Sequence, residues 1–270
     1  MAERLSRTAP YRAVIGSRIR AQQAYPTSFR LDILGALFVG LTELGEVWVV
    51  FHGGRRIGGL DFRQILLVFG LSNLAFSTAD MIAGHLDRIP DYIRSGTLDA
   101  FYLRPQPVLA QLMTSDFQLR RLSRVAVGLV AFVFGIFRND IEWGIRTVGL
   151  LVIALVCGVA IFAALFVCAG SLQFFLVNGA ELTNSFTYGG SYAAQQPASV
   201  FPHPLMLLFG YLVPVVFVGY LPTLALLRLP GPSTLPSWLV WLTPLVAVWI
   251  WGVALLLWRW GIRHYQGGGG

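Results

Sequence analysis

Four polar side chains stand inside stretches that are otherwise apolar. Glu43 and Glu46 lie in the first long apolar run of the chain, and Asn73 and Asp80 lie in the second. Glu43 and Glu46 are three residues apart, so a helix places them on one face. Charged groups at membrane depth are costly, and they usually face a bundle interior or a wet cavity. The four side chains therefore either line a path for a substrate or a proton, or satisfy one another and pack two helices together.

The sequence contains no recognisable catalytic constellation. Its histidines, at positions 52, 85, 203 and 264, are dispersed, and no nucleophile-elbow or zinc-protease motif occurs. His85, Asp87 and Asp91 have metal-ligating side chains, but their spacing matches no metal-site pattern, which favours a solvated loop. The chain has no lysine, so it holds neither a Walker A lysine nor a lysine Schiff base. We therefore expect a protein that is not an enzyme and has no metal or cofactor of its own.

Composition indicates that most of the chain is surrounded by lipid. Hydrophobic residues make up 56% of the 270 residues, charged residues make up 12%, and the mean hydropathy is +0.66. Soluble domains carry about 25% charged residues, so a chain this poor in charge is expected to be a membrane protein. Each membrane-spanning helix needs about 20 residues, which leaves room for six spans and their loops.

The apolar runs predict an all-α membrane protein with six transmembrane helices. Pro214 interrupts the fifth span, and the apolar, proline-rich residues 221–237 predict a broken, re-entrant segment before the sixth. Residues 178–204 are polar and nearly uncharged, which indicates a linker. The predicted spans are residues 31–51, 62–83, 119–137, 148–177, 205–220 and 238–258.

The N-terminal and C-terminal stretches complete the predicted organisation. Residues 1–30 are rich in arginine and place several apolar side chains near one helical face, which indicates a helix lying in the headgroup layer. Residues 31–258 are then a six-helix bundle, and residues 259–270 are a cytoplasmic tail. The whole chain is expected to form a single transmembrane domain.

The arginines predict the orientation in the membrane. With the N-terminus inside, 14 of the 20 arginines lie on one side, and the other 6 lie opposite, at positions 55, 56, 63, 138, 146 and 228. Positive residues are enriched in cytoplasmic loops, so both termini and the connector at 84–116 are expected in the cytoplasm. Arg120, Arg121 and Arg124, at the start of the third span, are expected to snorkel to the membrane surface.

The connector between the second and third spans contains the run IRSGTLDAFYLRPQP at residues 93–107. Gly96 supplies a bend and Thr97 a candidate N-cap, so residues 98–103 are predicted to form a short helix. Pro105 disfavours continuation of the helix through the residue before it. A short helix on the cytoplasmic surface between two spans is a good shape for a partner protein to push on.

This run resembles the cytoplasmic R-S-G-x-L-D-x-x-L-L-R-P run of a group of bacterial ABC exporter permeases with the type-2 architecture. Phe101 and Tyr102 stand where that group more often has aliphatic residues. The C-terminal WRWGIRHYQGGGG is similar to the ending of the same group, an aromatic and basic helix end followed by a tyrosine and small residues. The matching positions in the run are Arg94, Ser95, Gly96, Leu98, Asp99, Leu103, Arg104 and Pro105.

The resemblance implies the permease subunit of an ATP-driven efflux system in the bacterial inner membrane. In such systems two permease copies, identical or paralogous, sit on two separate ATPase subunits that use ATP and Mg; nucleic acid has no part. The short helix is then implied to be a coupling helix in a groove of the ATPase, with the N-terminal helix touching the same subunit. The broken segment is implied to form part of an outer gate. Glu43, Glu46, Asn73 and Asp80 become candidates for the translocation path.

Two other functional classes stay open at this point. A secondary transporter or channel that works without ATP would be favoured by inverted repeats, and the two halves show no convincing similarity. A membrane-embedded enzyme acting on lipid would need catalytic side chains that converge near one leaflet, and the acids and histidines do not converge. A purified complex with a nucleotide-binding subunit would support the exporter, whereas a stable, active single chain would oppose it.

Overall fold

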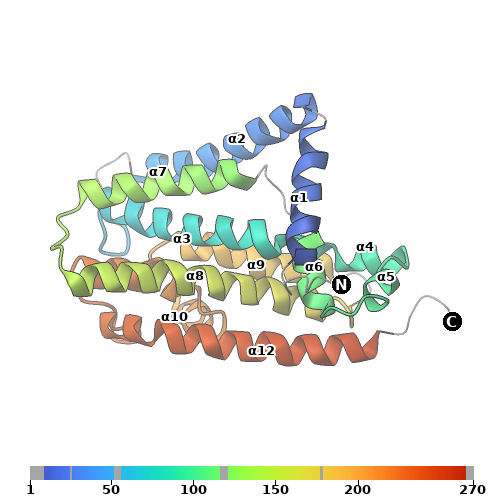
Figure 1. Ribbon diagram of the computed structural model, residues 1–270. Coiled ribbons are helices and arrows are strands. Elements are labelled where there is room, and N and C mark those ends of the chain that lie inside the picture. The colour runs from blue at the N-terminus through green and yellow to red at the C-terminus, as the bar shows by residue number, and fades with distance from the viewer. Residues whose placement is uncertain (1–8, 25, 52–55, 116–120, 177–178, 266–270) are drawn as a thin grey trace.

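The computed structural model describes residues 9–24, 26–51, 56–115, 121–176 and 179–265 (Figure 1). Within these ranges the fold is all-α, with no named strand. This confirms the predicted fold class at the level of secondary structure. The first eight residues of the N-terminal stretch and residues 266–270 of the tail lie outside the described residues, as do Asp116 to Arg120.

Five long helices run side by side along the length of the molecule (Figure 1). The central one, α3, packs against α2, α7 and α8, and α8 packs against α12. Side chains on every face of α3 are buried, including Leu67, Phe69 and Leu71. Polar groups on this helix are therefore enclosed by protein. The five helices are α2 (Pro26–Phe51), α3 (Phe62–Ala83), α7 (Leu122–Arg138), α8 (Ile145–Leu172) and α12 (Thr243–His264).

Three segments are long and apolar enough to cross a membrane: Phe62–Arg94, Ile145–Leu172 and Ser237–His264. A fourth is added if the bent pair His203–Leu212 and Val215–Leu226 counts as one span. The chain is thus a helical membrane protein with three or four such spans among its described residues. The helix α8 has 28 residues, and at about 1.5 Å per residue it exceeds a hydrocarbon core of about 30 Å.

The bent pair breaks where the sequence places a proline. Helix α10 (His203–Leu207) continues as the wider turn η4 (Leu208–Leu212). This first half, His203–Leu212, meets the second half, Val215–Leu226, at an angle of 73°. Pro214 lies at the break, because proline has no backbone donor for a continuing helix. The predicted interruption is therefore confirmed. After the break come the short turn η5 (Val215–Phe217) and the helix α11 (Tyr220–Leu226). The start of the segment 221–237, which was predicted to be broken, is therefore helical.

The prediction of a linker at residues 178–204 is wrong. Helix α9 (Ala180–Ala194) occupies most of it, followed by the short turn η3 (Ala198–Val200). The adjacent Gly189 and Gly190 both lie inside this helix. Packing of α9 against α3 and α8 accounts for this, because tertiary contacts override weak local propensity.

One end of the molecule gathers the short helices of the connector after α3 and both described chain ends (Figure 1). The helix α1 (Ala9–Gln23) lies across the long helices and packs against α2 and α6, which confirms a helix in the N-terminal stretch. The connector after α3 folds into η1 (Gly84–Arg88), α4 (Ile89–Arg94), α5 (Asp99–Tyr102) and α6 (Val108–Ser115). The predicted helix at 98–103 is confirmed in its centre. The final turn before α12 is η6 (Ser237–Leu242).

Candidate functional site

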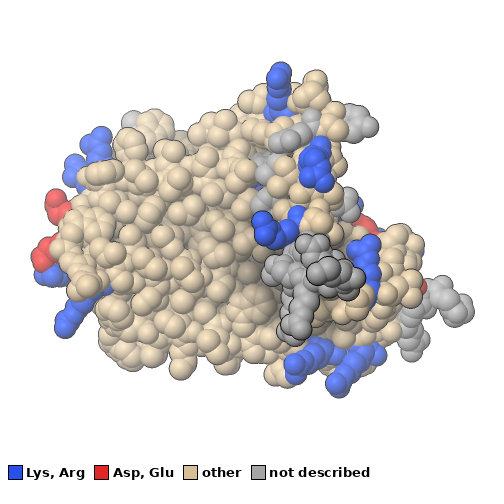
Figure 2. Space-filling view, in the orientation of Figure 1, with Lys and Arg blue, Asp and Glu red and all other residues tan. Residues whose placement is uncertain are grey.

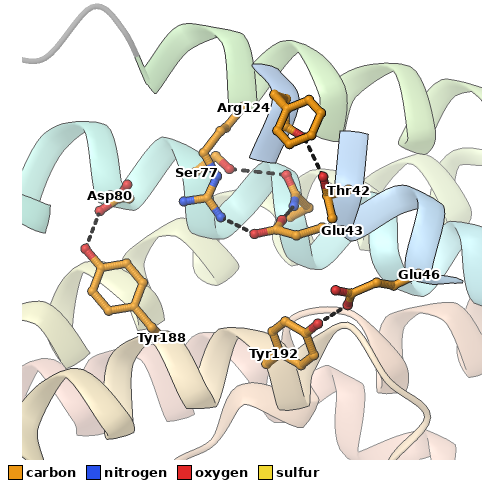
Figure 3. A network of polar contacts seen from close by, with 10 residues as sticks. Thr42, Glu43, Glu46, Ser77, Asp80, Arg124, Tyr188 and Tyr192 are labelled. Atoms are coloured by element: carbon orange, nitrogen blue, oxygen red, sulfur yellow. Dashed lines mark hydrogen bonds and ion pairs between the residues drawn. The ribbon is translucent and has the colours of Figure 1, made fainter. Parts of the chain in front are cut away.

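Glu43 on α2 is held by two other helices (Figure 3). Its carboxylate forms an ion pair with Arg124 of α7 at 2.6 Å. Asn73 of α3 donates its side-chain amide to the other carboxylate oxygen of Glu43 at 2.9 Å. Ser77 donates to the Asn73 carbonyl oxygen at 3.2 Å, and the Arg124 guanidinium lies 5.6 Å from the centre of the Phe76 ring. The structure thus brings together two of the predicted polar residues, Glu43 and Asn73.

Asp80 lies two turns further along α3 and has its own cationic partner. Arg121 of α7 pairs with the Asp80 carboxylate and also donates to its backbone carbonyl. From α9, the Tyr188 hydroxyl lies 3.5 Å from Asp80 and 3.4 Å from Asp87 (Figure 3). Asp80 is 3% exposed, so this pair stabilises the packing of α3, α7 and α9 against one another.

Glu46 faces a different neighbour from Glu43. The hydroxyl of Tyr192 on α9 donates to the Glu46 carboxylate, which links α2 to α9 (Figure 3). All four predicted polar residues therefore have protein partners. We call this set the polar network; its members are Glu43, Glu46, Asn73, Ser77, Asp80, Arg121, Arg124, Tyr188 and Tyr192.

The expectation that the α7 arginines snorkel to the membrane surface is wrong for the two described ones. The side chains of Arg121 and Arg124 are only 13% and 15% exposed, and both point at buried carboxylates. An arginine in the first turns of a span reaches the surface by default, but a carboxylate on the facing helix gives it a better partner. Tyr188 and Tyr192 were missed because their helix was predicted to be a linker. An amphipathic spacing of tyrosine and threonine over residues 183–192 was the available signal.

A polar cavity of about 360 Å³ opens beside the network. Asp80, Arg121, Arg124 and Tyr188 contribute polar atoms to its wall, and residues at the start of α2 complete it. Both charge signs meet the cavity, so it suits a polar or zwitterionic group better than a simple ion. The α2 residues are Leu31, Asp32, Gly35 and Ala36.

His85, Asp87 and Asp91 on the connector each have a different surrounding in the structure. His85 is buried, and its ring bonds to the backbone carbonyl of Leu112. Asp91 forms an exposed pair with Arg88 at 3.5 Å. Among the described residues, no group of three or more His, Cys, Asp or Glu side chains is arranged to hold a metal ion.

The second candidate site is the segment 89–106, which we call the α4–α5 segment. Gly96 has a φ of +68°, a conformation that glycine adopts without strain, and the chain reverses there as predicted. Thr97 is not an N-cap: its hydroxyl lies 2.7 Å from that of Ser95, and α5 begins without a side-chain cap. Leu98 is fully buried, whereas Leu103 is 88% exposed. The segment is thus anchored by one leucine and presents another.

The α4–α5 segment is held in shape by its own side chains. Gln111 of α6 donates to the carbonyl of Phe101 at 3.0 Å and to that of Gln106 at 2.7 Å. The Phe101 ring meets Tyr92 edge to face at 5.8 Å, and the Arg104 guanidinium lies 5.9 Å from its centre. Phe101 therefore organises the interior of the segment. The aromatic residue that departs from the resembled run acts here as an internal brace.

The remaining motif residues lie on the outside of the segment. Four of them are exposed to solvent: Arg94, Ser95, Arg104 and Pro105. Asp99 is half-buried and accepts a hydrogen bond from Tyr265 at 2.8 Å. A cavity of about 670 Å³ separates the segment from α1; among its lining residues are Tyr11, Val14, Phe101 and Arg104. Among the predicted coupling residues, Leu98 is thus buried as an anchor, while Arg94, Ser95, Leu103, Arg104 and Pro105 are exposed.

The chain matches the family model of the ABC-2 family transporter proteins over residues 37–269. This range includes the polar network, the α4–α5 segment and the C-terminal helix. No curated protein and no solved structure matches the chain. Because the family match extends over most of the sequence, the chain belongs to the ABC-2 family of transporter proteins, as a membrane-embedded permease component.

Proposed function

We propose that this chain is the membrane subunit of an ATP-driven exporter, and that a second permease copy and separate ATPase subunits complete the transporter. The supporting observation is the α4–α5 segment. It is braced by Gln111 and Phe101, yet it exposes an apolar side chain, Leu103, directly before Arg104 and Pro105. A braced surface that presents Tyr102 and Arg104 beside this leucine offers residue types that are enriched at protein–protein hot spots.

The proposed energy source lies outside this chain. A chain without lysine has no Walker A lysine, so ATP and Mg are proposed to bind the ATPase partner. Closure of the ATPase dimer would push on the α4–α5 segment, and the helices joined to it would tilt as near-rigid bodies. Such a switch requires contacts that differ between the two states.

The proposed topology has six spans. Four of these spans are α3, α8, the bent pair and α12, and the other two are α2 and α7. Helix α7, with 17 residues, is the shortest of the single helices. In this proposal, both termini and the α4–α5 segment lie on the cytoplasmic side of a bacterial inner membrane. The bent pair then lies toward the outer surface, where its 73° angle suits an outer gate.

The proposed translocation path runs beside the polar network. Glu43, Glu46, Asn73 and Asp80 are paired in this structure, and the cavity of about 360 Å³ lies next to Asp80 and its arginine partner. Tilting of α2 or α7 would exchange these internal pairs for contacts with a cargo. A cargo with both polar and apolar parts fits this lining best.

The test is purification of the tagged chain from its own membranes, with mass spectrometry of whatever proteins accompany it. An ATP-binding subunit is expected. Leu103→Asp is expected to reduce its recovery by about tenfold or more, the scale of losing an interface hot spot. Ile145→Asp is the matched control, because Ile145 is 92% exposed and lies at the start of α8.

Two results would contradict the proposal. One is a single chain that transports after reconstitution without any ATPase, which would indicate a secondary transporter or channel. The other is equal recovery of the ATP-binding subunit with Leu103→Asp and with Ile145→Asp, which would move the docking surface away from the α4–α5 segment.

A further inference from the structure

The end of α12 contacts the α4–α5 segment through two tyrosines, one on each side. Tyr265 is the first residue after α12, and its hydroxyl donates to Asp99 at 2.8 Å across 166 positions of sequence. Its ring stacks on Tyr102, with centroids 5.8 Å apart and an interplanar angle of 15°. The Tyr102 hydroxyl in turn lies 3.5 Å from the carbonyl of Ile262. The first and last residues of α5, Asp99 and Tyr102, are therefore both tied to the end of α12.

The Tyr102 hydroxyl remains protonated at physiological pH. Burial, and then the nearby negative charge of Asp99, raise the pKa of Tyr102 above its ordinary value. A neutral phenol is a donor, so at physiological pH the Tyr102 hydroxyl is available to the carbonyl of Ile262. Asp99 accepts from Tyr265 as a carboxylate, which makes this the stronger, charge-assisted kind of hydrogen bond.

Tyr265 also belongs to an aromatic cluster that joins α12 to α8. Phe174 lies just beyond the end of α8, 6.3 Å from the Tyr265 ring and 5.6 Å from Trp258. Phe175 packs on Trp260 at 4.6 Å. Because α8 and α12 also pack along their length, a displacement of Tyr265 acts on two long helices together.

The chain already connects the α4–α5 segment to α3 on one side and, through α6, toward α7 on the other. The helix α12 lies more than a hundred residues further on and meets the segment through space. A push on the segment therefore reaches the early helices through the backbone and α12 through Tyr265 and Tyr102, while Ile89, which lies beside Gly170, gives the segment a direct contact with α8.

We propose that Tyr265 is a positioning residue that carries movement of the α4–α5 segment to α12 and α8. This rests on the proposed function, because it assigns the route by which a push from the ATPase reaches the second half of the bundle. The hydrogen bond to Asp99 fixes the orientation of the Tyr265 side chain against α5, and the stacked Tyr102 ring supplies the contact area between them. Loss of the hydroxyl alone is expected to weaken the link without unfolding the end of α12.

The experiment measures movement at both ends of the link. Spin labels are placed at exposed position 91 on the segment and at exposed position 259 on α12, each paired with a reference label at position 145. Cys157 and Cys168 are first replaced by serine. Pulsed dipolar distances are recorded for the whole transporter complex in lipid nanodiscs, without nucleotide and with a non-hydrolysable ATP analogue.

Four variants separate the hydrogen bond from general damage. Tyr265→Phe and Asp99→Ala remove it from opposite ends, while Asp99→Asn keeps an acceptor oxygen and is expected to preserve the movement. Tyr211→Phe is the matched control, since it removes a tyrosine hydroxyl that bonds to the Thr234 carbonyl instead.

With the nucleotide analogue, both labels are expected to shift in the unmodified protein. In Tyr265→Phe and Asp99→Ala the label at 91 still shifts, but the ratio of shifted to unshifted populations at 259 falls about fivefold, the effect of one net hydrogen bond. The double variant is expected to be no worse than either single one, because the two changes remove the same contact.

The two possible failures are distinguishable. If the label at 259 shifts as fully in Tyr265→Phe and Asp99→Ala as in the unmodified protein, the role of Tyr265 is overturned and the proposed function stands. If the label at 91 does not respond to nucleotide in the unmodified complex, the proposed function itself fails, and the role of Tyr265 fails with it.

Discussion

At the scale of single residues, every carboxylate of the polar network faces a cation or a hydroxyl on another helix. Glu43 meets Arg124, Asp80 meets Arg121, and Glu46 meets Tyr192. Removing one partner of a buried ion pair is far more damaging than never having had the pair, because it leaves a charge without compensation. The network therefore holds α2, α3, α7 and α9 in one arrangement.

Glu43→Ala is expected to lower the free energy of unfolding by about 3–5 kcal/mol, since it leaves the largely buried Arg124 unpaired. Glu43→Gln is expected to cost less, because the amide oxygen still accepts from Arg124. Melting of the purified protein followed by tryptophan fluorescence measures both effects.

The control for this prediction is Glu142→Ala. Glu142 pairs with Arg228 at 2.5 Å, but the two side chains are 69% and 71% exposed, and exposed pairs contribute about 0–1 kcal/mol. Equal melting shifts for Glu43→Ala and Glu142→Ala would show that the network does not hold the helices together.

At the scale of elements, α3 and α7 approach each other closely because glycines face the partner backbone. A Cβ added at Gly70 would collide with the backbone of Phe132, and one at Gly135 would lie 2.8 Å from the Cα of Leu67. Small residues at such crossings let membrane helices gain close van der Waals contact. The short distance also brings the α7 arginines within reach of the carboxylates on α2 and α3.

Gly70→Ala is expected to destabilise the protein by about 1–3 kcal/mol through overpacking. Gly252→Ala in α12 is the matched change, because a Cβ there meets nothing within 4 Å, and alanine is favoured over glycine in a helix by about 1 kcal/mol. Melting temperatures are thus expected to move in opposite directions. A fall of equal size in both variants would contradict the close crossing of α3 and α7.

At the scale of the whole molecule, charge gathers at the two ends and leaves an uncharged flank between them (Figure 2). Large apolar side chains are exposed on α2, α8 and α12, among them Phe38, Val156 and Leu256. A surface of this kind is stable only against lipid or another apolar protein surface. The short helices of the connector after α3, which include the α4–α5 segment, share one end with the described start of the chain (Figure 1).

Single-cysteine labelling of intact cells tests which end faces the cytoplasm. In a background lacking Cys157 and Cys168, a membrane-impermeant maleimide is expected to label Ile145→Cys but not Leu103→Cys. Both positions are highly exposed, at 92% and 88%, so access to the thiol depends on the side of the membrane. Permeabilised cells, in which both cysteines should react, provide the control. Labelling at 103 and not at 145 would reverse the proposed orientation.

Several features follow from local properties of the chain. The second predicted span, 62–83, has the same bounds as α3, because the transfer of an apolar run into lipid depends on that run alone. The bend at Pro214 and the reversal at Gly96 follow from the backbone chemistry of proline and glycine. The motif at 94–105 could be recognised because it is local, and it indicated the family whose model matches residues 37–269.

The partners of the polar residues depended on how the helices pack. Arg124 lies 81 positions from Glu43, and Tyr265 lies 166 positions from Asp99, so no spacing along the chain relates them. Helix α9 read as a linker because its weak propensity is overridden by neighbours that only the folded chain supplies. Composition and motif therefore determine that this is a helical permease, whereas the close crossing of α3 and α7 decides which charges neutralise one another. The physical reason is that hydrophobicity acts residue by residue, while pairing requires two surfaces to meet.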